Sequence, residues 1–513
     1  MRSNNKTIAK NTILLYFRMI VTMIISLYTS RVILQTLGIN DYGTYQAVGG
    51  IVGVLSFVQT ALSTGTSRFI TFSIGEKNIV KLKRVFSTTL SAHFILASLV
   101  ILLAESIGLW FLYNKLNIPI ERQGAAVIVY HISVITAFFS LTQVPYHACI
   151  IAHERMNVYA YISMLDAVLK LLIAVAISYT SFDRLIVYAL LLFFLNLGIM
   201  LYYRLYCLRK FEESHYHLEF DKSLFKEITS FSGWSLLSGT SMALNNQGIL
   251  ILLNIFFSPA IVTARAISLQ VNMAANQLMS NFQTAANPQI VKMYAAKDYE
   301  GSKRLLLQTT RFSYYLMLMM CLPICLTAEP LLNLWLGKVP DYSVQFLQLI
   351  IIQSLFQVFN TSFYRALYTK GQLRENALLS PTLLISGFPV VYFLFVLGCS
   401  PVALSWVSLI AYAILGLVIK PILIIKIVDY TWKDVWSVFA PCINVTMVSI
   451  FVPLSFYSFF NKDIGDLRYV ISLVFISVIS VLLSVWFLGL SKPMRFELAK
   501  MVKSKFFVLR KDS

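Results

Sequence analysis

Ionisable side chains occur inside long apolar stretches of this 513-residue sequence. The basic ones are Arg18, Arg31, Arg68, Lys170, Arg265 and Arg311. Asp166 stands four residues before Lys170, a spacing that places both side chains on one face of a helix. Two interpretations stay open: a self-neutralising ion pair, or a titratable acid held beside a cation and suited to proton or sodium coupling. The arginines suggest a different chemistry, because a guanidinium binds phosphate through two parallel hydrogen bonds.

An acid followed by tryptophan occurs twice. Glu105 precedes Trp110 in "AESIGLW", and Glu329 precedes Trp335 in "AEPLLNLW". Tryptophan favours the headgroup belt of a membrane, so we expect each acid near a membrane surface, where it reaches water. Pairing of either acid, Glu105 or Glu329, with Arg31 or Arg265 is an alternative, and ion coupling through Glu105 is another.

The composition predicts which elements hold these residues. Hydrophobic residues make up 58 % of the sequence and charged residues 13 %, against about 45–50 % and about 25 % in soluble domains. A membrane-spanning helix needs about 20 mostly apolar residues. Fourteen stretches qualify, at residues 12–36, 43–72, 85–112, 123–145, 158–179, 185–206, 229–256, 260–286, 305–328, 342–364, 377–398, 401–424, 437–460 and 468–490. We therefore predict an all-α polytopic membrane protein with about 14 transmembrane helices.

The net charge of +19 does not indicate a nucleic-acid partner, because the basic residues form short clusters between the apolar stretches. With the N-terminus in the cytoplasm, most clusters fall on the inner side, as the positive-inside rule requires. We therefore expect both termini in the cytoplasm. The loops are short, and the chain carries no phosphate-binding loop and no cysteine pair with metal-site spacing. We predict no catalytic site, no metal and no cofactor, although an H+ or Na+ gradient can drive such a protein.

In this orientation the arginines differ in depth. Arg18, Arg68 and Arg311 lie within about three turns of the cytoplasmic end of their helices, where a long side chain also reaches water. Arg31 and Arg265 lie toward the outer side, where the positive-inside rule does not explain them. A passage lined by arginines and few acids suits an anionic substrate.

Three motifs repeat in the same order, about 215–225 residues apart. Besides the Glu-Trp motif, "SLTQV" at 140–144 returns as "SLFQV" at 354–358, and "GEKNIVKLKRVFSTT" resembles "AKDYEGSKRLLLQTT". Helices 1–6 therefore map onto helices 7–12 as parallel repeats. We predict an N-terminal lobe over residues 1–206, a cytoplasmic linker over 207–228, a C-terminal lobe over 229–426, and two extra helices with a basic tail over 427–513.

Polar residues share one face in each of two equivalent predicted helices. In helix 2 they are Gln46, Gly49, Gly53, Ser56, Thr60, Ser63 and Ser67, and in helix 8 they are Arg265, Ser268, Asn272, Asn276 and Gln283. For helix 2, close helix packing and a polar cavity both stay open. For helix 8 we expect a water-filled cavity, because guanidinium and amide groups are poor packing surfaces. Asn272 and Asn276 are therefore candidate substrate contacts.

The N-terminal segment resembles a transporter family. The motifs "SRVILQTLGINDYGTYQ", "STGTSRF" and "AESIGLW" are similar to those of bacterial O-antigen and capsular polysaccharide flippases, which belong to the multidrug/oligosaccharidyl-lipid/polysaccharide exporter superfamily. The resemblance implies a MATE-like fold of two pseudo-symmetric six-helix lobes plus two C-terminal helices, working by alternating access. It also implies the substrate, an undecaprenyl-diphosphate-linked oligosaccharide moved across the bacterial cytoplasmic (inner) membrane.

The resemblance further implies roles for residues and partners. Related lipid flippases place arginines in the cavity, and Arg31 and Arg265 match that role by helix placement. Coupling to H+ or Na+ is common in the superfamily, and our candidates for it are Asp166, Lys170 and Glu105. Expected partners are the lipid-linked oligosaccharide, membrane lipids, a polysaccharide polymerase and glycosyltransferases, with no nucleic acid.

Two other functions stay open. A multidrug or organic-cation antiporter of the same superfamily would require acids and aromatic residues in place of the arginines. A membrane-embedded polysaccharide-modifying enzyme would require a large outer loop or a catalytic pair. The outer loops are short, and we expect His93 and His131 to have packing roles.

Overall fold

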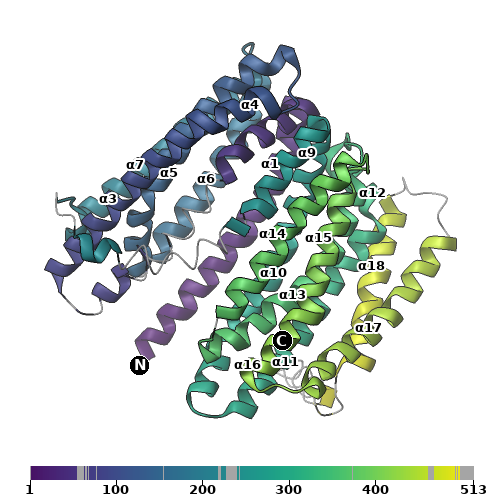
Figure 1. Ribbon diagram of the computed structural model, residues 1–513. Coiled ribbons are helices and arrows are strands. Elements are labelled where there is room, and N and C mark those ends of the chain that lie inside the picture. The colour runs from purple at the N-terminus through teal and green to yellow at the C-terminus, as the bar shows by residue number, and fades with distance from the viewer. Residues whose placement is uncertain are drawn as a thin grey trace, which may run out of the picture. The chain divides into compact units, whose positions relative to one another are not determined.

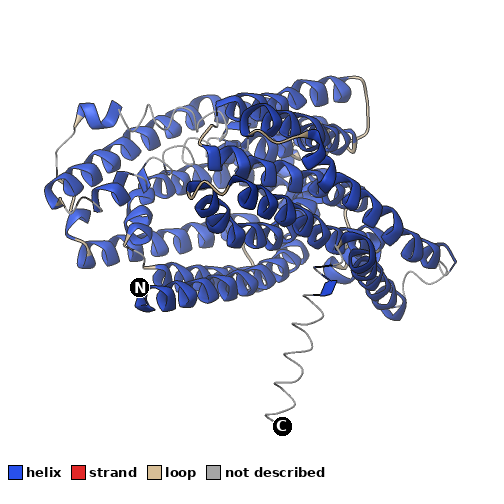
Figure 2. Cartoon of the chain, turned by 90° about the horizontal axis from the view of Figure 1, so that it is seen from below, coloured by secondary structure: helices blue, strands red, loops and turns tan. Residues whose placement is uncertain are grey.

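The computed structural model describes residues 2–54, 63, 66–67, 69–74, 76, 78–153, 155–217, 221–226, 240–241, 243–372, 374–459, 467–490, 493 and 495–496. Every regular element in these ranges is a helix (Figure 2). The predicted all-α fold is therefore confirmed.

Figure 1 labels the helices in chain order. Up to residue 214 they are α1 (Arg2–Val54), α3 (Ile79–Leu103), η1 (Ala104–Gly108), α4 (Leu109–Lys115), η2 (Ile120–Arg122), α5 (Gln123–Ala152), α6 (Met156–Ala176), η3 (Ile177–Tyr179), α7 (Arg184–Lys210) and η4 (Glu212–Ser214). From residue 244 they are η5 (Leu244–Gly248), α9 (Ile249–Phe256), α10 (Pro259–Ala295), α11 (Tyr299–Leu326), α12 (Ala328–Leu336), α13 (Ser343–Lys370), α14 (Arg374–Val396), α15 (Ala403–Ile414), η6 (Leu415–Ile419), α16 (Lys420–Val428), α17 (Trp432–Phe459), α18 (Leu467–Ser484) and η7 (Val485–Gly489).

Eleven helices in the described ranges are long and apolar enough to cross a membrane. This number is consistent with the fourteen predicted. The first two predicted helices share α1, and the seventh is described only from residue 240 onward. The eighth is α10, a 37-residue helix in which polar residues recur. The chain is therefore a multi-pass membrane protein.

The first two predicted helices join at Gly38. Its φ of 80° and ψ of 170° interrupt α1, and a positive φ favours glycine because no Cβ clashes with the backbone. Polar side chains satisfy carbonyl groups on both sides of this break. Arg184 donates to the Thr36 carbonyl at 3.1 Å, and the Thr263 hydroxyl donates to the Ile39 carbonyl at 2.7 Å. The break is thereby attached to α7 and α10.

The chain forms two compact units. The first contains Met1–Gln270, Lys338–Ser343 and Leu384–Pro401, and the second contains Val271–Gly337, Val344–Leu383 and Val402–Ser513. A core in the first unit surrounds the fully buried Tyr130, at the meeting of α1, α3 to α5 and α7. The second unit has an aromatic core in which Phe359 stacks on Tyr314 and meets Phe439 edge to face. The lobes deduced from the sequence repeat remain a prediction.

The chain beyond α7 is attached to the helices of the first unit. Glu213 is 2 % exposed, and it accepts a 2.5 Å hydrogen bond from the imidazole of His153, at the end of α5. The Phe211 ring stacks on the same imidazole, with ring centres 4.1 Å apart. The Tyr216 hydroxyl lies 2.9 Å from that of Ser91 on α3. The beginning of the predicted linker is therefore part of the folded unit.

Candidate functional site

The predicted pair on α6 is present. Lys170 Nζ donates to Asp166 Oδ2 at 2.8 Å, one helical turn away. Arg18 of α1 reaches the same helix, where its guanidinium donates to Ser163 Oγ at 3.4 Å and lies 4.8 Å from the centre of the Tyr159 ring. The interface of α1 and α6 therefore holds two cations and one carboxylate.

Arg204 of α7 is a further cation inside a spanning helix. Its Nη2 donates to Thr142 Oγ1 at 2.7 Å, and its guanidinium carbon lies 5.4 Å from the centre of the Tyr146 ring. Both contacts are with neutral groups on α5. Arg204 lies near the predicted cytoplasmic end of its helix, where the positive-inside rule also accounts for a positive charge.

Lys420 of the second unit is more deeply enclosed. It follows the π-helical turn η6 and is 2 % exposed. Its ammonium donates to Asn376 Oδ1 of α14 and lies 5.4 Å from the centre of the Tyr364 ring of α13. Lys420 therefore connects α16, α14 and α13 through neutral groups.

Arg31 and Arg265 lie on adjoining stretches of α1 and α10 in the first unit. The two helices are joined by a 2.5 Å hydrogen bond from Ser30 Oγ to Gln270 Oε1, in addition to the bond at Ile39. Arg31 is half-buried, and Arg265 is 2 % exposed. The structure therefore places both arginines on one helix pair, and it encloses Arg265.

Most of the polar face of α10 is closed by hydrogen bonds to α13. Ser354 Oγ donates to Asn272 Oδ1 at 2.5 Å and accepts from Asn276 Nδ2 at 3.1 Å. The buried members of the face are Arg265, Ser268 and Gln283. The predicted water-filled cavity is therefore wrong for these three residues, because hydroxyls and amides of one helix can satisfy those of the next. Asn272 and Asn276 keep partial exposure.

Of the two interpretations of predicted helix 2, the contacts of its described residues favour close helix packing. A Cβ added at Gly53 would lie 3.0 Å from Gln247 Cγ, and one added at Gly43 would overlap the Pro259 carbonyl. Small residues here allow α1 to approach η5 and α10. Two members of the predicted polar face, Ser56 and Thr60, lie outside the described residues.

Two further predicted basic candidates are Arg68 and Arg311. Arg68 lies outside the described residues. Arg311 is half-buried on α11, in the second unit. Their role in substrate binding stays a prediction.

Glu105 has a partner that we did not predict. Its Oε1 lies 3.0 Å from Nδ1 of His131 on α5. The His131 ring also packs edge to face on Tyr130, with ring centres 5.9 Å apart. The alternative pairing of Glu105 with Arg31 or Arg265 is replaced by the contact with His131. The sequence contained a signal for it, since both residues stand near the predicted outer ends of consecutive antiparallel helices.

A cluster of three charges connects helix ends in the first unit. Arg122 Nη2 lies 2.6 Å from Asp41 Oδ2, and its Nη1 lies 2.5 Å from Asp183 Oδ2. Asp183 also caps α7 by accepting the N–H groups of Leu185 and Ile186. Burial opposes ionisation of Asp183, but the Arg122 guanidinium and these N–H groups outweigh it and hold its pKa below the ordinary value.

We expect Arg122→Ala to lower the free energy of unfolding by about 2 kcal/mol near neutral pH. Breaking a buried pair costs about 3–5 kcal/mol, and the partial exposure of these side chains, 20–30 %, reduces that cost. Ionised Asp183 stabilises the fold above its ordinary pKa, and this contribution disappears as the pH falls through the lowered value. The difference between wild type and variant should therefore shrink in acid. Thermal unfolding in detergent at several pH values measures it, with Glu121→Ala as the exposed control; a difference that grows in acid would contradict the assignment.

Comparison with known proteins gives a family and a fold. A family model described as "Polysaccharide biosynthesis protein" matches residues 35–345. No curated protein sequence matches the chain. Among solved structures, an inward-facing MATE multidrug transporter of the MOP superfamily has a TM-score of 0.67 at 14 % identity, covering 82 % of this chain and 99 % of its own.

Two further structures share this fold. The lipid II flippase MurJ, in an inward closed conformation, has a TM-score of 0.67 at 10 % identity and covers 93 % of this chain and 98 % of its own. A MOP superfamily transporter from Pyrococcus furiosus has a TM-score of 0.60 at 15 % identity and covers 82 % and 97 %. The predicted MATE-like fold is therefore confirmed.

Proposed function

Because the chain belongs to the polysaccharide biosynthesis protein family, we propose that it is a flippase for an undecaprenyl-diphosphate-linked oligosaccharide. This membership confirms the family predicted from the N-terminal motifs. The cargo is an O-antigen or capsule repeat unit, carried from the inner to the outer leaflet of the bacterial cytoplasmic membrane by alternating access. Glycosyltransferases supply the cargo and a polymerase consumes it, and the flippase itself forms no covalent bond.

The observation that carries the proposal is a surplus of positive charge within the spanning helices. Three cations there contact hydroxyl, amide and aromatic groups: Arg18, Arg204 and Lys420. Among the described acids there, Asp166 and Glu105 lie against basic groups, as does Asp41 of α1. Within the described ranges no carboxylate forms an ion pair with these three cations, which favours an anionic cargo, and a diphosphate provides several acceptor oxygens for them. A drug antiporter binds organic cations, which need free acids. Asp166 and Glu105 already contact Lys170 and His131, and this disfavours the drug antiporter.

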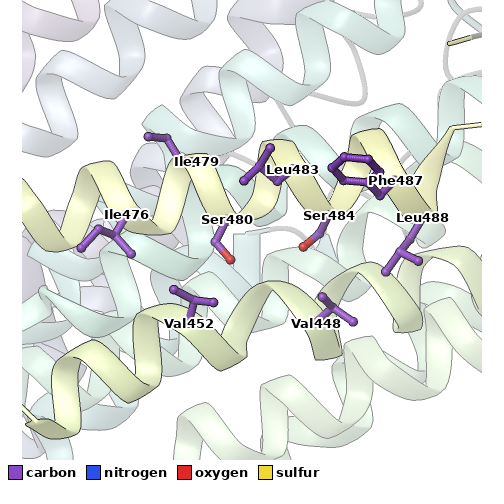
Figure 3. A pocket seen from close by; sticks show the side chains of 9 residues that line it. All are labelled: Val448, Val452, Ile476, Ile479, Ser480, Leu483, Ser484, Phe487 and Leu488. Carbon is purple, nitrogen blue, oxygen red and sulfur yellow. The ribbon is translucent and has the colours of Figure 1, made fainter.

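The second unit offers a place for the lipid tail. A groove of about 660 Å³ lies between α17 and α18 (Figure 3), and it is lined by Val448, Val452, Ile476, Ile479, Ser480, Leu483, Ser484, Phe487 and Leu488. Ser480 Oγ donates to the Ser449 carbonyl at 2.8 Å, so this hydroxyl is satisfied within the protein. The remaining surface is mostly hydrocarbon, and it suits the isoprenoid chain of a polyprenyl lipid.

Filling the groove should slow transport. We expect Val452→Trp to reduce cargo translocation roughly fivefold, because displacing one or two CH₂ groups removes about 0.8 kcal/mol each and about 1.4 kcal/mol corresponds to a factor of ten. Phe451→Trp is the matched control, since Phe451 is the adjacent residue, is 74 % exposed and lies outside the groove. Equal rates for the two variants in a reconstituted assay would argue against tail binding here.

Deletion of the gene tests the function in cells. The deletion strain should accumulate lipid-linked oligosaccharide in the inner leaflet and lose surface glycan, and plasmid-borne wild type should restore both. The leaflet is assigned by treating spheroplasts with a membrane-impermeant oxidant that attacks sugars. An unchanged amount of oxidant-accessible cargo in the deletion strain would refute the proposed function.

A further inference from the structure

A small polar cavity lies among three helices of the second unit, α10, α11 and α13. Two aliphatic side chains line part of it, and the remaining walls are polar: Gln283, Asn287, Thr309, Thr310, Ser362 and Arg365. Its volume is about 10 Å³, which is room for about one water-sized atom. The cavity is therefore a site for a single small ligand.

Arg365 of α13 brings a positive charge to this cavity. Its Nε is buried and has no hydrogen-bond partner among the described residues. None of the residues that line the cavity is acidic. A buried charged donor without an acceptor is costly, and such a group in a native structure indicates a missing partner. The missing partner is an acceptor, and the charge of the guanidinium favours an anion.

The hydroxyl groups around the cavity differ in whether they can donate to a ligand. Gln283 Nε2 donates to Ser362 Oγ at 2.8 Å, so the hydrogen of this hydroxyl remains for another acceptor. The Thr310 hydroxyl already donates to the Leu306 carbonyl at 2.8 Å. Ser362 and Arg365 stand three residues apart on α13, a spacing that places them on one face of the helix. This face therefore offers a neutral and a charged donor to the same ligand.

The volume of the cavity limits which anion can enter. A phosphate or a carboxylate has several heavy atoms, and a space for about one water-sized atom cannot enclose it. Chloride is a single atom and accepts hydrogen bonds from any direction. A water molecule also fits, but it carries no charge and leaves the Arg365 guanidinium without a counter-ion. The cavity therefore favours chloride over both an oxyanion and water.

The first copy of the predicted sequence repeat has apolar residues at these positions. The offset that relates "SLTQV" to "SLFQV" places Ala148 at the position of Ser362 and Ile151 at the position of Arg365. Ala148 belongs to an apolar core of the first unit that also contains Val85 and Ile150. Hydrocarbon is thus sufficient to pack these positions, and the arginine and serine of the second copy need another explanation.

We propose that this cavity binds one chloride ion, held by the Arg365 guanidinium and the Ser362 hydroxyl, and that the ion stabilises the packing of α10, α11 and α13. The bound ion neutralises the guanidinium and gives its Nε an acceptor. The site goes beyond the proposed function and does not depend on it, because its ligand is neither the cargo nor a part of it. Removing chloride should loosen this part of the second unit.

Thermal unfolding of the full-length protein in detergent tests the site without any cargo. The unfolding temperature is measured in sodium chloride and in sodium gluconate at equal ionic strength and pH. The difference between the two salts should favour chloride by about 2–4 °C more in wild type than in Arg365→Gln. Arg374→Gln removes an exposed arginine outside the cavity and should behave as wild type. Equal differences in wild type and Arg365→Gln would overturn the proposal.

A second variant keeps the positive charge. Ser362→Ala removes only the neutral donor, and it should raise the chloride concentration that gives half of the stabilisation by about tenfold, the factor equivalent to one hydrogen bond to a charged group. This variant also decides the matter if Arg365→Gln does not fold. An unchanged half-point in Ser362→Ala would exclude the serine from the site.

Bromide locates the ion directly, because it resembles chloride and scatters X-rays anomalously. Crystals of the full-length protein grown in sodium bromide should show an anomalous peak within hydrogen-bond distance of Arg365 Nε and Ser362 Oγ. Density without an anomalous signal at this position would show an ordered water only, and it would overturn the proposal. Anomalous peaks confined to other parts of the protein would overturn it equally.

Discussion

Replacing Arg31 with alanine will lower the rate of cargo translocation by at least about tenfold. Arg31 is a half-buried cation on α1, in the outer part of the predicted first helix, where the positive-inside rule does not account for it. A hydrogen bond to a charged group contributes about 1.5–3 kcal/mol, and about 1.4 kcal/mol is a factor of ten. The measurement is the initial rate at which labelled polyprenyl-diphosphate oligosaccharide becomes accessible in the opposite leaflet of proteoliposomes.

Matched variants separate binding from folding. Arg31→Lys keeps the charge but loses the two-pronged geometry, so it should give an intermediate rate. Arg209→Ala removes an exposed arginine at the end of α7 and should leave the rate unchanged. Arg265→Ala needs a parallel unfolding measurement, because Arg265 is 2 % exposed and its loss also disturbs packing. Wild-type rates in Arg31→Ala at normal stability would exclude this arginine from cargo binding.

The largest effect on stability should come from Glu213→Ala, which we expect to lower the free energy of unfolding of the first unit by about 3 kcal/mol. The Glu213 side chain is 3 % exposed, and its removal leaves His153, itself 29 % exposed, without its carboxylate partner. The linker segment that stacks on His153 through Phe211 should then detach more readily. Thermal unfolding and the rate of proteolysis within the linker both report this change.

The neighbouring residue provides the control for this prediction. Glu212 forms an ion pair with Lys83 at 3.4 Å, but its side chain is 78 % exposed. Exposed ion pairs contribute about 0–1 kcal/mol, so Glu212→Ala should change the unfolding temperature little. Equal destabilisation by the two variants would show that burial of Glu213 does not matter, contrary to the structure.

Apolar length and periodicity were sufficient to predict much of the fold. The breaks at Gly38 and before Pro259 lie at or close to the tight connections expected from the sequence. What the sequence did not reveal are the π-helical turns, such as η1 and η6. A single extra residue in a helical turn does not alter the apolar pattern, because membrane helices are apolar on most of their surface.

The candidate site was predictable only within single helices. The contact of Asp166 with Lys170 followed from their spacing on one helix. The contact of Glu105 with His131 depends instead on which helices are neighbours and on the π-helical turn. The prediction of a water-filled cavity along the polar face of α10 failed for the same reason. The sequence does not show which helices are neighbours, and so it does not show that Ser354 of α13 contacts Asn272.

The most direct test of the account compares two cargoes in the same proteoliposomes. Purified protein should move a fluorescent undecaprenyl-diphosphate oligosaccharide between leaflets far faster than protein-free vesicles do, and it should not accumulate a lipophilic organic cation under any ion gradient. The surplus of intramembrane cations predicts this preference. Gradient-driven accumulation of the organic cation, with no acceleration of the diphosphate-linked cargo, would contradict it.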